Sequence, residues 1–116
     1  MAKCRIDYKI NNEHFKTIGI FKSNRLTFME NDIKFSITIN DNSLELRREN
    51  DEYKLKIILA DKSSCIYELK NINVGKLNIE VLKKSLEIKN NYIKAKYKLD
   101  DALFDLELTY EVIEWL

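Results

Sequence analysis

IKFSITI, residues 33–39, decides the fold class, because apolar and polar side chains alternate along it without exception. The odd-numbered positions are all Ile or Phe, whereas the even-numbered positions are Lys, Ser and Thr. Successive side chains of a β-strand point to opposite faces of its sheet, so this alternation predicts a strand with one buried and one solvated face. One buried face per strand is typical of antiparallel sheets.

The same alternation recurs on both sides of this strand. Apolar residues that share a face are Cys4/Ile6/Tyr8/Ile10, Leu26/Phe28, Leu44/Leu46, Tyr53/Leu55/Ile57/Leu59, Leu77/Ile79/Val81, Ile93/Ala95/Tyr97/Leu99 and Phe104/Leu106/Leu108/Tyr110/Val112. Short connections rich in Asn and Asp separate these stretches, as in tight antiparallel turns. A meander of this length must close or stack to hide its edges. We therefore expect a single all-β domain, residues 1–116, folded as an antiparallel up-and-down β-barrel of about eight to ten strands.

The alternation changes phase once. Leu77, Ile79 and Val81 are odd-numbered, but the apolar residues at 82, 86 and 88 are even-numbered. A change of phase by one residue predicts a β-bulge or a tight bend near residues 83–85. A short helical turn in LKKSLEIK, residues 82–89, is the alternative.

Composition narrows the class of protein. The 116 residues are 45% hydrophobic and 34% charged, with a formal net charge of +1, which suits one globular domain and argues against nucleic-acid binding. The Lys-rich segment 83–98 and the acidic segment 100–114 are expected to be the solvated faces of neighbouring strands. No stretch is apolar enough to cross a membrane or act as a secretory signal. Isolated Cys4 and Cys65 fit buried thiols in a reducing cytoplasm, and the abundance of Lys, Ile and Asn suggests a bacterial source.

Several short motifs, taken in order, resemble those of one family. Phe28-Met29-Glu30 ends one expected strand, and Leu44-Glu45-Leu46-Arg47-Arg48 forms another. CIYEL, GKLNIEV and YIKAKYKL follow. In this order the motifs resemble the bacterial YwiB-like proteins over residues 17–112. The resemblance implies a calycin-like, lipocalin-style β-barrel and carries no established function. Asn50 departs from a glycine of the family pattern, and Lys83 departs from a threonine.

Arg48 and Glu30 each continue the apolar face of a strand with a charge. An unpaired buried charge is costly, so we expect these two side chains to meet near the end of the barrel. In one interpretation they form a structural ion pair that closes one mouth of the barrel. In the other, Arg48 holds an anionic ligand group in a bidentate fork, and Glu30 orients it.

Tyrosines add polar groups, mostly on the expected inner faces, at Tyr8, Tyr53, Tyr67, Tyr97 and Tyr110, and the last four are the candidate ligand-binding tyrosines. Their rings either fill the core, with hydroxyls bonded to one another or to the two charges, or line a ligand pocket. The large inward side chains favour a mostly filled barrel with at most a shallow cavity at one end.

The sequence predicts no enzyme, no metal site and no cofactor. His14 is the single histidine and lies beside a turn, so a Ser-His-Asp set without it is impossible. Two cysteines fit no metal spacing, and two glycines make no phosphate loop.

The C-terminal stretch EVIEWL, residues 111–116, suggests a second kind of site. Ile113 and Trp115 are expected to point outward beside Leu116, either as a homodimer or partner surface or as a tail folded across a barrel end. The leading hypothesis is a non-enzymatic barrel that binds a small anionic or amphipathic ligand at one mouth. The alternative is a structural or interaction protein with a filled barrel, which self-associates or binds a protein partner through an outer apolar surface.

Overall fold

The computed structural model describes residues 1–70 and 75–116, and its regular elements there are eleven β-strands. They are β1 (Ala2–Ile10), β2 (Glu13–Lys22), β3 (Arg25–Glu30), β4 (Ile33–Ile39), β5 (Leu44–Glu49), β6 (Tyr53–Leu59), β7 (Ser64–Leu69), β8 (Lys76–Ile79), β9 (Val81–Lys89), β10 (Tyr92–Leu99) and β11 (Ala102–Trp115). The prediction of about eight to ten strands was too low. Glu80 separates β8 from β9, so the stretch from Lys76 to Lys89 forms two strands. The helical alternative for residues 82–89 was wrong, since β9 is extended there.

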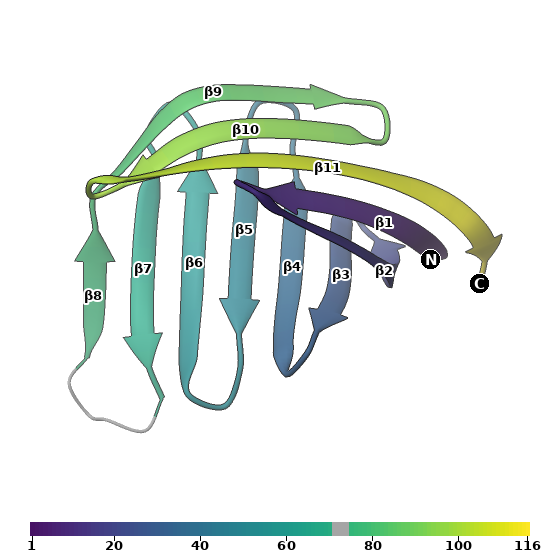
Figure 1. The fold of residues 1–116 in the computed structure, drawn as a ribbon, viewed down its shortest axis with the longest axis horizontal. Helices are drawn as coiled ribbons and strands as arrows, with labels where there is room; N and C mark the ends of the chain where they lie inside the picture. The colour runs from purple at the N-terminus through teal and green to yellow at the C-terminus, as the bar shows by residue number, and fades with distance from the viewer. Residues whose placement is uncertain (71–74) are drawn as a thin grey trace.

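All eleven strands form one antiparallel sheet in the order β8-β7-β6-β5-β4-β3-β2-β1-β11-β10-β9. Neighbours in the sheet are therefore neighbours in the chain, except that β1 pairs with β11. The two ends of the sheet are β8 and β9, which Glu80 alone connects. The result is a nearly closed barrel, as the up-and-down prediction required (Figure 1).

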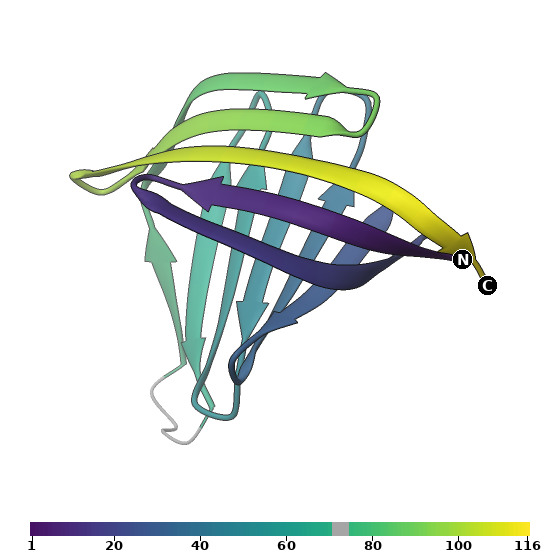
Figure 2. The same cartoon turned by 45° about the vertical axis from the view of Figure 1, so that its right-hand side comes forward.

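The sheet wraps so that its two halves face each other. Strands β9, β10, β11, β1 and β2 cross in front of β3–β8, whose strands run in a steeply different direction (Figures 1 and 2). The crossing strands cover only one end of the rear strands. The other end of β4–β8 extends beyond them and is called the open end below (Figure 2).

Gly19 marks the corner at which the chain passes from one half to the other. β2 pairs with β1 from Glu13 to Phe21 and with β3 from Gly19 onward. A Cβ atom at Gly19 would lie 2.5 Å from the Thr27 carbonyl oxygen and 2.5 Å from Ile6 Cδ1. Only glycine fits such a close backbone approach, which is typical of strand bends at barrel corners.

Two bulges interrupt the ladders. Ser85 pairs with Lys96 but Lys83 pairs with Tyr97, which confirms the predicted bulge near residues 83–85. The second lies at the C-terminus, where Val112 pairs with Cys4 and Glu114 with Lys3, so Ile113 is the extra residue. The alternation of the sequence did not reveal the second bulge.

Most hairpins turn through the residues that the sequence pointed to. Asn11, Ser23, Asn24, Asn31, Asn91 and Asp100 all have positive φ between 50° and 62°. Asn and Asp tolerate this left-handed conformation better than most residues, which explains their abundance at the turns.

The core lies between the two halves. One complete cross-strand row, called the closed row, consists of the directly paired residues Leu26, Ile37, Leu46, Ile57, Cys65 and Ile79. Cys4 and Cys65 are buried free thiols, and burial raises the pKa of both. They act as small apolar side chains, as predicted.

The outer face carries the complementary charges that the sequence suggested. Lys94 pairs with Glu107, and Lys96 pairs with Asp105. Lys96 Nζ lies 3.9 Å from Asp105 Oδ2. His14 is exposed and contacts Asp7. The described residues contain no helix long and apolar enough to cross a membrane.

Candidate functional site

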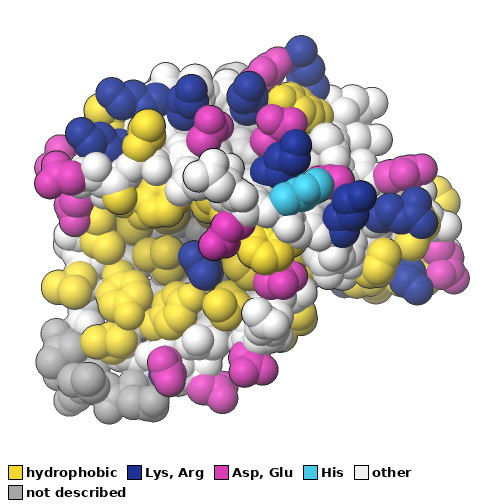
Figure 3. All heavy atoms as spheres, in the orientation of Figure 1, with side chains coloured by type: hydrophobic (Ala, Val, Ile, Leu, Met, Phe, Trp, Pro, Cys, Tyr) yellow, Lys and Arg dark blue, Asp and Glu magenta, His cyan; other side chains and the backbone are white. Residues whose placement is uncertain are grey.

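The candidate site begins with a second row of paired residues, which lies two residues farther along each strand toward the open end than the closed row. This row, called the Arg48 row, consists of Gly19, Phe28, Phe35, Arg48, Leu55, Tyr67 and Leu77. Arg48 lies near the middle of this row and is its only charged residue. Since its paired neighbours Phe35 and Leu55 belong to the inward-facing set, the prediction that Arg48 faces inward is confirmed. Figure 3 shows hydrophobic side chains gathered in a hollow on this side of the molecule, below the crossing strands.

Arg48 lacks the partners that a guanidinium usually has. Its Cζ lies 5.1 Å from the centroid of the Phe35 ring, a cation–π contact. Its Nε is buried and has no hydrogen-bond partner among the described residues. Arg48 also takes part in none of the ion pairs found within residues 1–70 and 75–116. A buried donor without a partner is costly and calls for an explanation.

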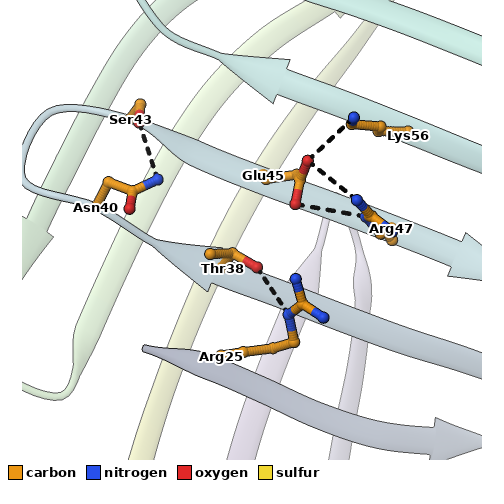
Figure 4. A network of polar contacts seen from close by, with 7 residues as sticks. All are labelled: Arg25, Thr38, Asn40, Ser43, Glu45, Arg47 and Lys56. Atoms are coloured by element: carbon orange, nitrogen blue, oxygen red, sulfur yellow. Dashed lines mark hydrogen bonds and ion pairs between the residues drawn. The ribbon is translucent and has the colours of Figure 1, made fainter. Parts of the chain in front are cut away.

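Arg47, the next residue, differs in having a carboxylate partner, although its buried Nε, like that of Arg48, has no hydrogen-bond partner among the described residues. It points to the outer face, where its Nε lies 3.4 Å from Glu45 Oε2, and Lys56 Nζ lies 3.4 Å from Glu45 Oε1 (Figure 4). Thr38 accepts a hydrogen bond of 3.1 Å from Arg25 Nε nearby. Burial raises the pKa of Glu45, but Arg47 and Lys56 lower it by more, so that it lies below its ordinary value.

The predicted Arg48–Glu30 ion pair is absent from the described residues. Glu30 pairs with Ile33, one row nearer the open end, and β4 separates β3 from β5. At about 4.8 Å per strand spacing, the two backbones are roughly 10 Å apart across the sheet. The stacked rings of Phe28 and Phe35, with centroids 5.1 Å apart, occupy the intervening positions.

Glu30 and Arg48 nevertheless line one cavity. Its volume is about 190 Å³, and its walls are Tyr8, Ile10, Glu13, Phe15, Phe28, Glu30, Asn31, Ile33, Phe35 and Arg48. A smaller cavity of about 60 Å³ adjoins it and shares Tyr8, Ile10, Phe35 and Arg48. The barrel is thus mostly filled, with a modest cavity toward one end, as the inward side-chain volumes predicted.

An aromatic cluster forms part of the wall of the larger cavity. The Tyr8 ring lies 5.7 Å from Phe28, 5.9 Å from Phe35 and 6.1 Å from Phe15. Burial raises the pKa of Tyr8 to about 12, although the Arg48 charge opposes the shift and Glu13 adds to it. Burial likewise raises the pKa of Tyr97, again against the Arg48 charge. Both hydroxyls are therefore neutral hydrogen-bonding groups near the guanidinium.

The four tyrosines predicted for the site separate into three places. Tyr97 lines the smaller cavity beside Arg48. Tyr53 and Tyr67 stack on each other at 5.8 Å and line neither of these two cavities. Tyr110 stacks on Phe21 at 5.5 Å, away from both.

Of the residues that the β1–β2 hairpin supplies to the larger cavity, Tyr8 was among the inner tyrosines predicted from the sequence, whereas Glu13 and Phe15 were missed. The alternation placed Tyr8 on the inner face, but it gave no sign that this hairpin would lie against β3–β5. The described residues hold no group of three or more His, Cys, Asp or Glu side chains arranged for a metal ion.

Exposed apolar side chains lie at the C-terminus and at the N-terminal Met1. They are called the C-terminal patch below and consist of Met1, Ile113, Trp115 and Leu116. Trp115 is 76% exposed and Leu116 is 61% exposed. The expectation that Ile113 and Trp115 share the outer face was wrong. The bulge at Ile113 shifts the register, and Trp115 pairs with Ala2, a residue of the inward-facing set.

These features define a class: a nearly closed antiparallel β-barrel with an aromatic cavity and an unpaired inward arginine toward its open end. No family model matches the sequence, and no curated protein matches it significantly. Among solved structures, the chain is similar to the crystal structure of the YwiB protein from Bacillus subtilis, at 18% sequence identity and a TM-score of 0.66. The match covers 97% of this chain and 91% of that one, which confirms the resemblance to YwiB-like proteins at the level of the fold.

Proposed function

We propose that this protein binds, without catalysis, a small ligand that carries an anionic group, in the cavity beside Arg48. One observation carries the proposal: a guanidinium with a buried Nε and no hydrogen-bond or ion-pair partner in the described chain lines an aromatic cavity. A carboxylate or phosphate would supply the missing acceptor in bidentate geometry. The neutral Tyr8 and Tyr97 hydroxyls provide further polar contacts near the same point.

The size and lining of the cavity limit the ligand. A volume of about 190 Å³ is smaller than that of pockets for drug-sized ligands, roughly 300–1,000 Å³. The walls are mostly aromatic and aliphatic, so the body of the ligand is apolar and compact. The proposal includes a calycin-like role for the barrel, in which the interior holds one small ligand as in lipocalins. Two free buried cysteines suit a reducing compartment, so we place this role in the cytoplasm.

Benzoate and its uncharged analogue benzamide test the proposal, because the two share a ring and a shape. We expect calorimetric titration to detect benzoate binding to the wild type and binding of benzamide at least about tenfold weaker, since hydrogen bonds to charged groups contribute about 1.5–3 kcal/mol. Arg48→Met should remove the preference for benzoate. Arg47→Met is the matched control, because it removes the same charge from the outer face.

Two results would overturn the proposal. Equal binding of benzoate and benzamide to the wild type would show that the anion is not recognised. Equal benzoate binding to the wild type and to a folded Arg48→Met variant would show that Arg48 is not the anchor. Circular dichroism and thermal unfolding establish that each variant is folded.

A second candidate function is self-association through the C-terminal patch, which its exposure favours. β10 pairs with β11 only as far as Thr109, so residues 111–115 have β1 on one side and no strand on the other within the described sheet. Two copies of this edge would pair antiparallel about a two-fold axis centred on Ile113.

Mass measurement by light scattering tests self-association directly. The wild type should be a dimer at high concentration, and Trp115→Ala should shift it toward the monomer. Leu103→Ala removes another exposed apolar side chain, 56% exposed, and should leave the mass unchanged. A wild type that stays monomeric throughout would eliminate this candidate.

A further inference from the structure

The charges around the larger cavity point to a more specific ligand. Arg48 is the one cation in its lining, while Glu13 and Glu30 contribute two carboxylates. We infer that the ligand is a zwitterion, with a carboxylate directed to Arg48 and an ammonium group directed to Glu13 and Glu30. This inference rests on the proposed function and names the class of ligand for the same cavity.

The carboxylates explain why an ammonium group on the ligand should add to its affinity. A ligand with only a negative charge would gain Arg48 but would be repelled by Glu13 and Glu30 across a cavity that partly excludes water. An ammonium group on the same ligand converts that repulsion into attraction. Ammonium groups also interact favourably with aromatic faces, and Tyr8, Phe15 and Phe28 line the same space.

The positions of the three charges set the direction of the ligand. Arg48 lies in the Arg48 row with its Nε buried. Glu30 ends β3 one row nearer the open end, and Glu13 begins β2 and is exposed. The carboxylate of the ligand therefore points inward and the ammonium toward solvent. Because the Arg48 and Glu30 backbones are roughly 10 Å apart, the two ligand charges belong at opposite ends of an apolar body.

The surroundings of the neutral Tyr8 hydroxyl support this arrangement. The hydroxyl senses Arg48, which lowers its pKa, and Glu13, which raises it. The positive and negative walls therefore both lie within electrostatic range of one ring at the centre of the aromatic cluster. The ring of the ligand is expected to stack in the same cluster.

Three probes of nearly equal shape separate the contributions of the two charges. They are 4-(aminomethyl)benzoate, which is a zwitterion, 4-ethylbenzoate, which lacks the ammonium group, and 4-isopropylbenzylamine, which lacks the carboxylate. In calorimetric titrations of the wild type, the zwitterion should bind about fivefold or more tightly than 4-ethylbenzoate, as expected for one partly exposed ion pair. It should bind more tightly still than the amine.

Variants assign each contribution to its residue. The double variant Glu13→Gln/Glu30→Gln should bind the zwitterion no more tightly than 4-ethylbenzoate, while its affinity for 4-ethylbenzoate is retained or raised. Arg48→Met should weaken both carboxylates. Glu52→Gln, an exposed carboxylate outside the lining of this cavity, is the matched control and should change nothing.

The outcomes distinguish this inference from the proposed function. If 4-ethylbenzoate binds the wild type as tightly as the zwitterion, the zwitterion inference fails while the anion site stands. If neither carboxylate binds, both fail. If the amine binds as tightly as the zwitterion, and Arg48→Met does not weaken the zwitterion, the cavity is a cation site and both are again overturned.

Discussion

The closed row and the Arg48 row are adjacent, are built on the same strands and follow the same alternation, yet the core includes Phe28 and Phe35 of the Arg48 row and does not extend along it to Leu77. In the closed row Leu26 is fully buried and Ile57 is 4% exposed. In the Arg48 row Leu77 is 60% exposed, and Arg48 occupies a position equivalent to Leu46. The difference arises from uneven coverage by the crossing strands, because Tyr8 of β1 packs on Phe28 and Phe35, whereas Leu77 at the β8 end of the row is exposed. Alternation thus specifies which face a residue takes, and coverage specifies whether that face is core.

The largest expected effect contrasts one leucine from each row. Leu26→Ala should lower the free energy of unfolding by about 2–5 kcal/mol, because it leaves a cavity in a packed core. Leu77→Ala should change it by no more than about 0.5 kcal/mol, since its side chain is already in solvent. Urea unfolding measures both. Equal losses would show that the open end is covered in solution.

A slightly smaller effect is expected at the corner that places one layer over the other. Gly19→Ala should cost roughly 1–3 kcal/mol of stability, because the new Cβ meets the Thr27 carbonyl, which cannot move freely. Ile18→Ala, an exposed neighbour on the same strand, is the control and should cost little. A Gly19→Ala variant as stable as the wild type would mean that the corner is not tightly packed.

Arg48 offers a test of opposite sign. In the absence of ligand, Arg48→Met should leave the free energy of unfolding unchanged or raise it by up to about 1 kcal/mol. Removal of an unpartnered buried donor stabilises the fold, and loss of the cation–π contact offsets part of that gain. Arg47→Met should lower it by about 0.5 kcal/mol, since Arg47 has a carboxylate partner. A clear loss on Arg48→Met would identify Arg48 as a structural residue.

The smallest effect concerns the pH dependence of the outer face. The pKa of Glu45 is lowered in the folded state, so this residue contributes stability above the unfolded value of about 4.3. That contribution disappears as the pH falls through the lower folded pKa. Wild type should therefore lose more stability on acidification than Glu45→Gln, when urea unfolding is compared at neutral and acidic pH. Parallel losses would contradict the lowered pKa.

Much of the fold could be predicted because its determinants are local. Period-two alternation located the strands, Asn and Asp located the turns, and a change of phase located the bulge at residues 83–85. The inward direction of Arg48 followed from the same rule. The second bulge escaped, although Glu111 and Glu114, which pair with Arg5 and Lys3 on the outer face, lie an odd number of residues apart.

The candidate site was less predictable because it depends on relations between strands. The alternation placed Arg48 and Glu30 on inner faces but could not say that β4, with Phe35, lies between them. It placed Tyr8 on an inner face but gave no indication that the β1–β2 hairpin also supplies Glu13 and Phe15 to the same cavity. Both facts depend on strand order and on the corner at Gly19, which no single stretch of sequence records.

The pairing of β1 with β11 has a consequence for how the protein folds. Every other neighbouring pair in the described sheet joins strands that are consecutive in the chain, so each needs only a short loop to close. The β1–β11 pair instead brings Ala2 to Trp115, with nearly the whole chain as its loop. Local hairpins should therefore form early, and the meeting of the first and last strands should be the slow event that completes the sheet.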